Sequence, residues 1–252
     1  MLTSELAKMC GWKENGCYDL IVVGAGPAGI GAAVAAGRKG LKVALLESYG
    51  YAGGAGTQSC TPLYYGFGVS GKQSTAGLSD EFIRRMDEEG AASLILYDRC
   101  AMPEFRPIGD RPLTAKVQLH SETMKLVYRR MLEEAGVETI FYAKVVDAVV
   151  EEEPPRKKHG DNVSEENVFS GEKIKALVVS CLEGTCLMYA DYFIDATGDG
   201  HLFQMAGAPV RKYAQEDGLH KSMFFFVGGV TPFDHEYNCR IYKEAYEAGR
   251  LP

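Results

Sequence analysis

IVVGAGPAGIGAA, residues 21–33, is an apolar run that breaks into closely spaced glycines. Gly24, Gly26 and Gly29 match the pattern G-x-G-x-x-G. In that pattern the first glycine makes a strand-to-helix turn, the second admits a pyrophosphate, and the third lets the helix lie close on the sheet. The helix N-terminus offers free N–H groups and a partial positive charge to phosphates. The stretch therefore predicts a dinucleotide site, and it leaves NAD and FAD equally open.

The segments around these glycines predict a βαβ unit. Residues 18–23 (YDLIVV) and 42–47 (KVALLE) are short apolar runs typical of strands. Residues 27–39 are rich in Ala and Gly, which predicts a closely packed helix, and Gly40 is placed to end it. Two such strands joined through a helix lie parallel, with a right-handed crossover. We therefore expect an α/β fold with a Rossmann-like parallel sheet.

Glu47 is the candidate that would recognise the sugar of the dinucleotide. It ends the second strand, 23 residues after Gly24. An acidic side chain at this spacing accepts hydrogen bonds from both hydroxyls of an adenosine ribose and repels a 2′-phosphate. The alternative is a solvent-exposed glutamate at the end of a strand. The ribose interpretation suits NAD and FAD equally.

Composition and charge exclude several classes of partner. The chain has 252 residues, of which 46% are hydrophobic and 24% charged, and its formal net charge is −7. Nucleic acids and anionic membranes bind to basic patches, so we expect neither as a partner. The seven cysteines contain no C-x-x-C pair, so we expect no metal site. The N-terminus has no signal-peptide pattern, and a reducing cytoplasm is the expected location.

Two further motifs separate FAD from NAD. Residues 47–57 read ESYGYAGGAGT, and residues 194–210 read IDATGDGHLFQMAGAPV. With the glycine turn, these motifs resemble the FAD-dependent oxidoreductases of the glutathione-reductase-type superfamily, which have two dinucleotide-binding domains. The resemblance covers about residues 18–230 and implies FAD as the cofactor. It also implies that this chain lacks the C-terminal part such proteins usually have.

The resemblance implies a role for each matching position. The three glycines face the pyrophosphate and Glu47 holds the adenosine ribose. Gly53 and Gly54 let the next loop pass close to the cofactor, and Val145 or its neighbour contacts adenine through its main chain. Asp199 either bonds a cofactor hydroxyl or belongs to a simple turn. The full set of expected cofactor-binding residues is Gly24, Gly26, Pro27, Ala28, Gly29, Glu47, Ser48, Gly53, Gly54, Thr57, Val145, Ala196, Thr197, Gly198 and Asp199.

The resemblance and the sequence pattern together predict how the chain is divided. Ser121 is placed as the N-cap of a helix whose apolar residues recur at helical spacing. Strand-like runs follow it and predict a β-meander. We expect an N-terminal tail at 1–16, an FAD-binding domain at 17–200 with an insertion at 58–113 and an exposed hairpin at 151–173, and an incomplete substrate or interaction domain at 201–252.

No residue is assigned as catalytic from the sequence, because the flavin itself carries the redox chemistry. Cys60 is a weak candidate, since it lies on the loop expected to approach the flavin; a small packed residue is the alternative. Arg106 and Arg111 are candidates to clamp a carboxylate, or else exposed loop residues. His120 and His201 are candidate proton donors.

Three functions remain open at this stage. The first is an FAD-dependent oxidoreductase, or its FAD-binding portion, that acts on an unidentified small molecule. The second is a non-catalytic or split subunit that needs a partner chain. The third, an NAD-dependent dehydrogenase, is disfavoured by Gly53, Gly54 and the motif at 195–200. A homo-oligomer or a C-terminal partner chain is expected in addition to the small-molecule substrate.

Overall fold

The computed structural model describes residues 13–65, 68–69, 72–73, 75–95, 116–152, 172–210 and 235–250. The chain divides into two compact units, Met1–His220 and Lys221–Pro252. Arg106, Arg111 and most of the expected hairpin at 151–173 lie outside the described residues. The predicted division into a tail, an FAD-binding domain and a second domain stays a prediction.

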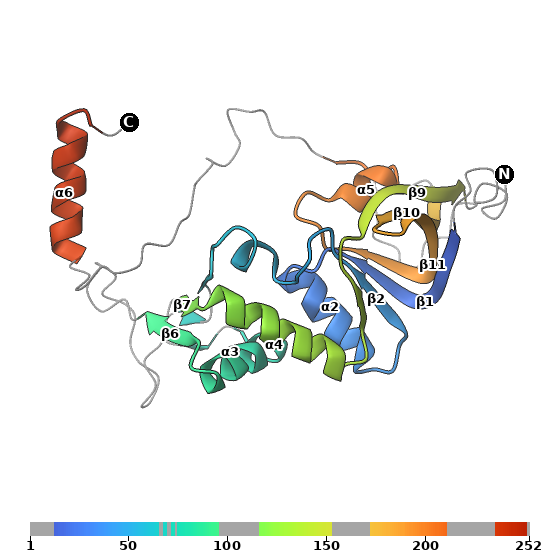
Figure 1. Cartoon of the computed structure of the whole chain (residues 1–252), viewed down its shortest axis with the longest axis horizontal. Helices are drawn as coiled ribbons and strands as arrows, with labels where there is room; N and C mark the ends of the chain where they lie inside the picture. The colour runs from blue at the N-terminus through green and yellow to red at the C-terminus, as the bar shows by residue number, and fades with distance from the viewer. Residues whose placement is uncertain are drawn as a thin grey trace, which may run out of the picture. The chain divides into compact units, whose positions relative to one another are not determined.

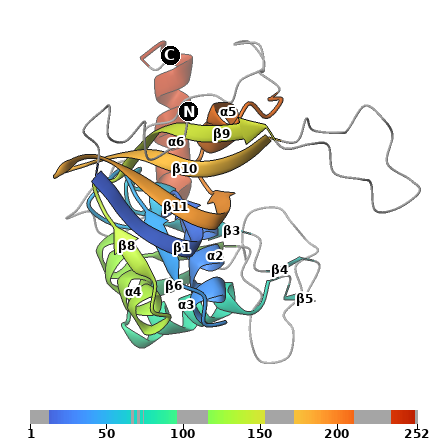
Figure 2. The same ribbon diagram turned by 90° about the vertical axis from the view of Figure 1, so that its right-hand side faces the viewer.

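A six-stranded sheet organises the first unit, in the order β8-β2-β1-β11-β10-β9. The β1 strand pairs in parallel with both β2 and β11, and β2 pairs in parallel with β8. The β10 strand pairs antiparallel with β9 and β11, which forms the predicted meander. Figure 2 shows β9, β10, β11 and β1 side by side. The strands are β1 (Lys13–Val23), β2 (Val43–Leu46), β8 (Glu138–Ile140), β9 (Lys144–Glu152), β10 (Glu172–Cys181) and β11 (Gly184–Asp195).

Three helices form a layer on one side of this sheet (Figure 1). They are α2 (Pro27–Gly37), α3 (Leu78–Glu88) and α4 (Ser121–Glu134). The α2 and α4 helices contact the strands, and α3 packs against α4. The parallel strands and α2 confirm the predicted Rossmann-like α/β fold. Side chains alternate along β1, so Leu20 and Val22 lie in the core with the helices. Ile21 and Val23 lie in a second core with the meander and the short helix α5 (His201–Met205).

Short strands lie within and beside the expected insertion at 58–113. A small sheet has the order β3-β7-β6, and a short antiparallel pair joins β4 and β5. A 3-10 turn, η1, precedes them. These short elements sit among Gly, Ser and Pro residues, so no run is long enough to show a period. Their bounds are η1 (Gly54–Gly56), β3 (Leu63–Tyr65), β4 (Gly68–Val69), β5 (Lys72–Gln73), β6 (Ala92–Ile95) and β7 (Lys116–Leu119).

The N-cap of α4 differs from the prediction. His120, not Ser121, is the N-cap, and its Nδ1 accepts a hydrogen bond from the N–H of Thr123. The hydroxyl of Ser121 instead donates to the carbonyl oxygen of Gly56, at 2.9 Å. This bond ties the start of α4 to η1. The local cap pattern was therefore overridden by a contact between segments far apart in the sequence.

In the second unit, the structure describes α6 (His235–Glu247) and the residues up to 250. Its exposed side chains include Ile241 and Tyr246. Across the described parts of both units, no helix combines the length and the apolar character that a membrane crossing requires.

Candidate cofactor site

An open cleft of about 690 Å³ lies where the parallel strands end. The strands β1, β2 and β11 all end at the same edge of the sheet. The glycine turn follows β1, Glu47 follows β2, and the Ala196–Asp199 turn follows β11. Crevices outside the carboxyl ends of parallel strands are where open α/β sheets bind ligands. The cleft has the volume of a typical cofactor site.

The structure brings most of the predicted cofactor-binding residues to this cleft. Gly29, Gly53 and Thr57 do not line it. Gly29 packs beneath the glycine turn, and the buried hydroxyl of Thr57 donates to the carbonyl oxygen of Ala52. The predicted residues that line the cleft are Gly24, Gly26, Pro27, Ala28, Glu47, Ser48, Gly54, Val145, Ala196, Thr197, Gly198 and Asp199.

The glycine turn is built from backbone contacts that leave no room for side chains. Gly24 has a φ of +97°, and a Cβ there would lie 2.8 Å from the carbonyl oxygen of Ala196. A Cβ at Gly29 would collide with the carbonyl oxygen of Gly24. The N–H of Gly53 donates to the carbonyl oxygen of Ala25 at 2.8 Å, which holds the loop of Gly53 and Gly54 against the glycine turn that follows β1. Three loops therefore meet through main-chain atoms.

Glu47 is buried, with 6% of its surface exposed, which overturns the solvent-exposed alternative. Its Oε2 accepts a hydrogen bond from the N–H of Ala25 at 2.8 Å. Its Oε1 accepts from the N–H of Tyr49 at 3.0 Å and from the hydroxyl of Ser48 at 3.1 Å. The Gln58 amide donates to the same oxygen at 3.5 Å. A buried charge needs such partners, and these tie β2 to the glycine turn.

Asp195 organises the opposite wall of the cleft, and sequence reasoning missed it. Its Oδ1 accepts from the N–H and the hydroxyl of Thr197, at 2.9 and 2.7 Å. Its Oδ2 accepts from the N–H of Phe203 at 2.9 Å. The hydroxyl oxygen of Thr197 in turn accepts from the N–H of His201 at 2.9 Å. The signal was an aspartate followed two residues later by threonine at a strand end, where a carboxylate closes a local turn.

Of the candidate proton donors His120 and His201 and the candidate Cys60, only His201 lines the cleft. His201 and Asp199 both line the cleft and are exposed, with Nε2 and Oδ2 3.9 Å apart. His120 caps α4 and is not among the residues that line the cleft. Cys60 is half-buried with a φ of +50°, and it does not line the cleft either.

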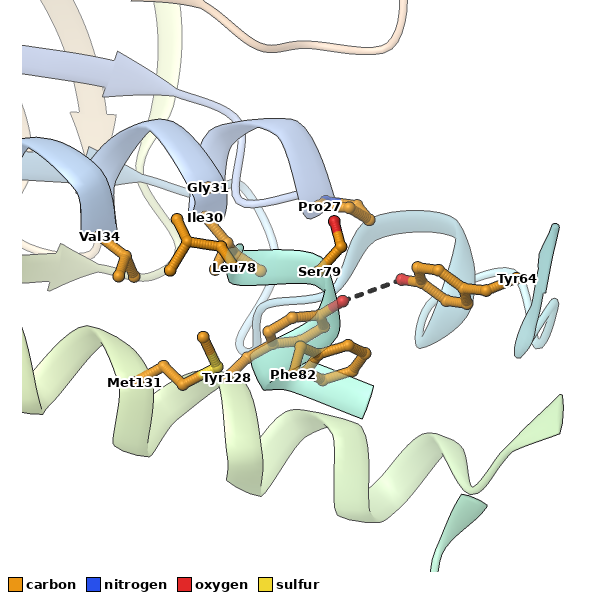
Figure 3. Close-up of a pocket in the computed structure, with 10 residues that line it drawn as sticks. All are labelled: Pro27, Ile30, Gly31, Val34, Tyr64, Leu78, Ser79, Phe82, Tyr128 and Met131. Atoms are coloured by element: carbon orange, nitrogen blue, oxygen red, sulfur yellow. Dashed lines mark hydrogen bonds between the residues drawn. The ribbon is translucent and has the colours of Figure 1, made fainter. Parts of the chain in front are cut away.

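A second, apolar pocket of about 70 Å³ lies between α2, α3 and α4 (Figure 3). Its floor includes the stacked rings of Phe82 and Tyr128, whose centroids are 4.2 Å apart. The hydroxyls of Tyr64 and Tyr128 share a hydrogen bond of 2.9 Å, drawn as a dashed line in Figure 3. Burial raises the pKa of both hydroxyls. Pro27 lines this pocket and the cleft, so α2 separates the two.

Comparison with protein families identifies the group to which the chain belongs. The profile of the FAD dependent oxidoreductase family matches residues 19–252. The chain is a member of this family. The membership indicates FAD as its cofactor and places the chain among the flavoenzymes. No functionally curated protein matches the chain.

Solved structures share the fold at low sequence identity. A geranylgeranyl bacteriochlorophyll reductase-like protein of Thermoplasma acidophilum is 18% identical, with a TM-score of 0.50 over 76% of this chain and 42% of that one. AlpK is 17% identical, with a TM-score of 0.50 over 75% and 33%. THI4 of Thermovibrio ammonificans is 18% identical, with a TM-score of 0.44, and the match covers 82% of this chain and 68% of THI4. The chain thus spans less than half the length of the first two.

Three features of the cleft bear on how it could hold the FAD that the family membership indicates. The first turn of α2 carries no acidic side chain of its own, so the partial positive charge of its N-terminus is not neutralised from within the helix. A Cβ built at Gly26 would lie 4.0 Å from the Cα of Gly54, so these two glycines bring the first and second loops close together at the cleft. The carboxylate of Glu47 lines the same cleft.

Proposed function

We propose that the cleft holds the adenosine and pyrophosphate half of FAD, and that the chain transfers a hydride or electrons between FAD and a small molecule. The carrying observation is that the glycine turn, Glu47 and the Ala196–Asp199 turn meet at one sheet edge. The two motifs and the order of βαβ unit, meander and returning parallel strand also support a glutathione-reductase-type relationship.

Glu47 is the residue proposed to hold the adenosine ribose. Each carboxylate oxygen offers about two acceptor positions. Among the described residues, Oε2 accepts only from the N–H of Ala25, so one position remains for a ribose hydroxyl. Because the carboxylate is already fixed by backbone donors, it is oriented before the nucleotide arrives. This preorganisation lowers the cost of binding.

The first turn of α2 is proposed to hold the pyrophosphate. The first N–H groups of a helix have no partner within it. Pro27 occupies the first helical position, where its missing N–H costs nothing, and the N–H groups of Ala28 and Gly29 follow it in the first turn. On the far wall, Asp199 and the backbone of Ala196–Gly198 face the same cleft. Val145, at the start of β9, is proposed to contact adenine through its main chain.

Bound FAD supplies the redox chemistry, and the chain supplies binding, orientation and electrostatics. Glu47, α2 and the Ala196–Asp199 turn fix the nucleotide end of the cofactor. Among the described residues that line the cleft, His201 carries an imidazole, the side chain that serves most often as a general acid or base.

The test is the cofactor content of the purified chain. We expect a visible flavin absorption band, and release of FAD when the protein is denatured. If the protein is purified without cofactor, titration with FAD should restore the band. A colourless protein that cannot be reconstituted with FAD would overturn the proposal, and binding of NAD alone would indicate a dehydrogenase instead.

A second candidate is a subunit that binds FAD only together with a partner chain or a second copy. Exposed apolar side chains on β11 favour it, because Tyr192 is 72% exposed and Ile194 38%. Both lie on the strand that leads into the Ala196–Asp199 turn. The solution mass, measured by light scattering with and without FAD, separates the candidates. Replacing Tyr192 with Ser should weaken any association; a monomer that retains FAD would exclude this candidate.

A further inference from the structure

The hairpin of β10 and β11 places two cysteines on the same face of the sheet. In this antiparallel pair Val179 faces Cys186, and Cys181 faces Gly184. Facing residues point to the same side, and residues two apart on a strand do so as well. Cys181 therefore shares a face with Val179 and, across the strands, with Cys186. The two sulfur atoms lie 3.9 Å apart.

The surroundings allow the two thiols to approach each other. Gly184, opposite Cys181, has no side chain, and a Cβ there would meet nothing within 4 Å. The Cys181 side chain can therefore lean diagonally toward Cys186 without a competitor. Cys186 is buried with 7% of its surface exposed, whereas Cys181 is half-buried. The thiol of Cys181 is therefore accessible to a small reagent, whereas that of Cys186 is shielded from solvent.

We propose that Cys181 and Cys186 form a reversible disulfide when the protein meets a peroxide. The thiol of Cys181 loses its proton to solvent, and the resulting thiolate attacks one oxygen of hydrogen peroxide and breaks the O–O bond. Cys181 becomes a sulfenic acid, and the departing hydroxide takes up a proton from solvent to become water. The thiol of Cys186 then attacks that sulfur, and the sulfenic oxygen leaves as water. Two thiols are oxidised by two electrons, and one peroxide is reduced to two waters.

The strain needed to form the Cys181–Cys186 disulfide explains why this disulfide would be reversible. The sulfur atoms must approach from 3.9 Å to about 2.05 Å. Diagonal neighbours on paired strands have Cα atoms roughly 7–8 Å apart, slightly beyond the usual disulfide range. The hairpin end must therefore move, and the exposed turn at Leu182 and Glu183 is the place where movement is least restricted. A strained disulfide is reduced readily by dithiols.

Glu183 lies between the two cysteines and provides a sharp test. The folded protein, as purified, is exposed to hydrogen peroxide, its free thiols are alkylated, and it is cleaved after glutamate. We expect the peptides on either side of Glu183 to stay joined, and to separate after dithiothreitol. Cys181 and Cys186 should escape alkylation before reduction, and both should be alkylated when reduction precedes alkylation.

Three variants define the outcomes. Cys186→Ser should leave Cys181 oxidised without any joined peptides, and Cys181→Ser should leave Cys186 unreacted. Cys17→Ser, which removes an exposed thiol on β1, should leave the cross-link intact. Full alkylation of both thiols after peroxide would overturn the proposal. A cross-link that forms only in denaturant, or that joins Cys181 to another cysteine, would overturn it as well.

Discussion

The two sides of α2 differ in how much room they leave for a side chain at a glycine position. Toward the sheet, a Cβ at Gly29 would collide with the carbonyl oxygen of Gly24. Toward the apolar pocket, a Cβ at Gly31 would meet nothing within 4 Å. The cleft edge is therefore built from main-chain contacts that permit no added atom. The helix layer on the other side is built from side chains, where changes should have graded effects.

The largest effect is expected from a side chain at Gly29. Gly29→Val should lower the free energy of unfolding by about 3 kcal/mol or more, because backbone must move to admit it. Gly31→Ala is the matched control in the same helix, and it should raise stability by about 0.5–1 kcal/mol. Urea denaturation measures both. Similar effects at the two positions would remove the contrast between the two sides of α2.

The next largest effect should come from Glu47. Glu47→Ala removes charged hydrogen bonds to the N–H groups of Ala25 and Tyr49. It also removes the charge-assisted hydrogen bond proposed to hold the ribose, which contributes about 1.5–3 kcal/mol, so FAD affinity should fall by roughly one to two decades. Flavin fluorescence titration gives the dissociation constant.

Glu47→Gln separates charge from shape, because the amide keeps one acceptor oxygen. Its affinity should fall between those of the wild type and Glu47→Ala. Glu151→Gln, which breaks an exposed ion pair with Lys175, is a control that should leave FAD affinity unchanged. Unaltered affinity in Glu47→Ala would refute the ribose assignment.

Asp195 extends the comparison to the far wall of the cleft. Asp195→Ala should free the Thr197 turn and the start of α5, and destabilise the fold by about 1–2 kcal/mol. FAD should bind more weakly although Asp195 itself does not line the cleft. Asp195→Asn keeps an acceptor oxygen and should recover part of that loss. If neither variant affects FAD binding, the turn is not positioned by this carboxylate.

The smallest effect belongs to the helix layer, where Glu81 bridges Arg38 and Arg85. The hydrogen bond from Arg38 lowers the pKa of Glu81 to about 2. This stabilisation is present above the unfolded pKa near 4.5 and is lost as the pH falls toward 2. Glu81→Gln should cost at most about 1 kcal/mol at neutral pH. Between pH 5 and pH 2, the free energy of unfolding of Glu81→Gln should fall less than that of the wild type, by at most about 1 kcal/mol. If the free energies of unfolding of the two proteins fell in parallel over this pH range, the prediction would be contradicted.

The sequence predicted the parts of the cleft that depend on local pattern. Gly24, Gly26 and Glu47 are marked by spacing along one βαβ unit, and parallel strands bring their ends together. Asp195 was missed because its partners, including Phe203, become visible only when the turn is closed. The Tyr64–Tyr128 hydrogen bond joins residues 64 positions apart, so no local pattern reports it.

The relative affinity of the chain for FAD and FMN tests the central claim most directly. Both carry the same flavin ring, but FMN lacks the adenosine half that the cleft is proposed to hold. We predict that FAD binds at least about 100-fold more tightly, equivalent to about 2.7 kcal/mol. Equal affinity for the two flavins would show that the glycine turn and Glu47 do not hold the nucleotide.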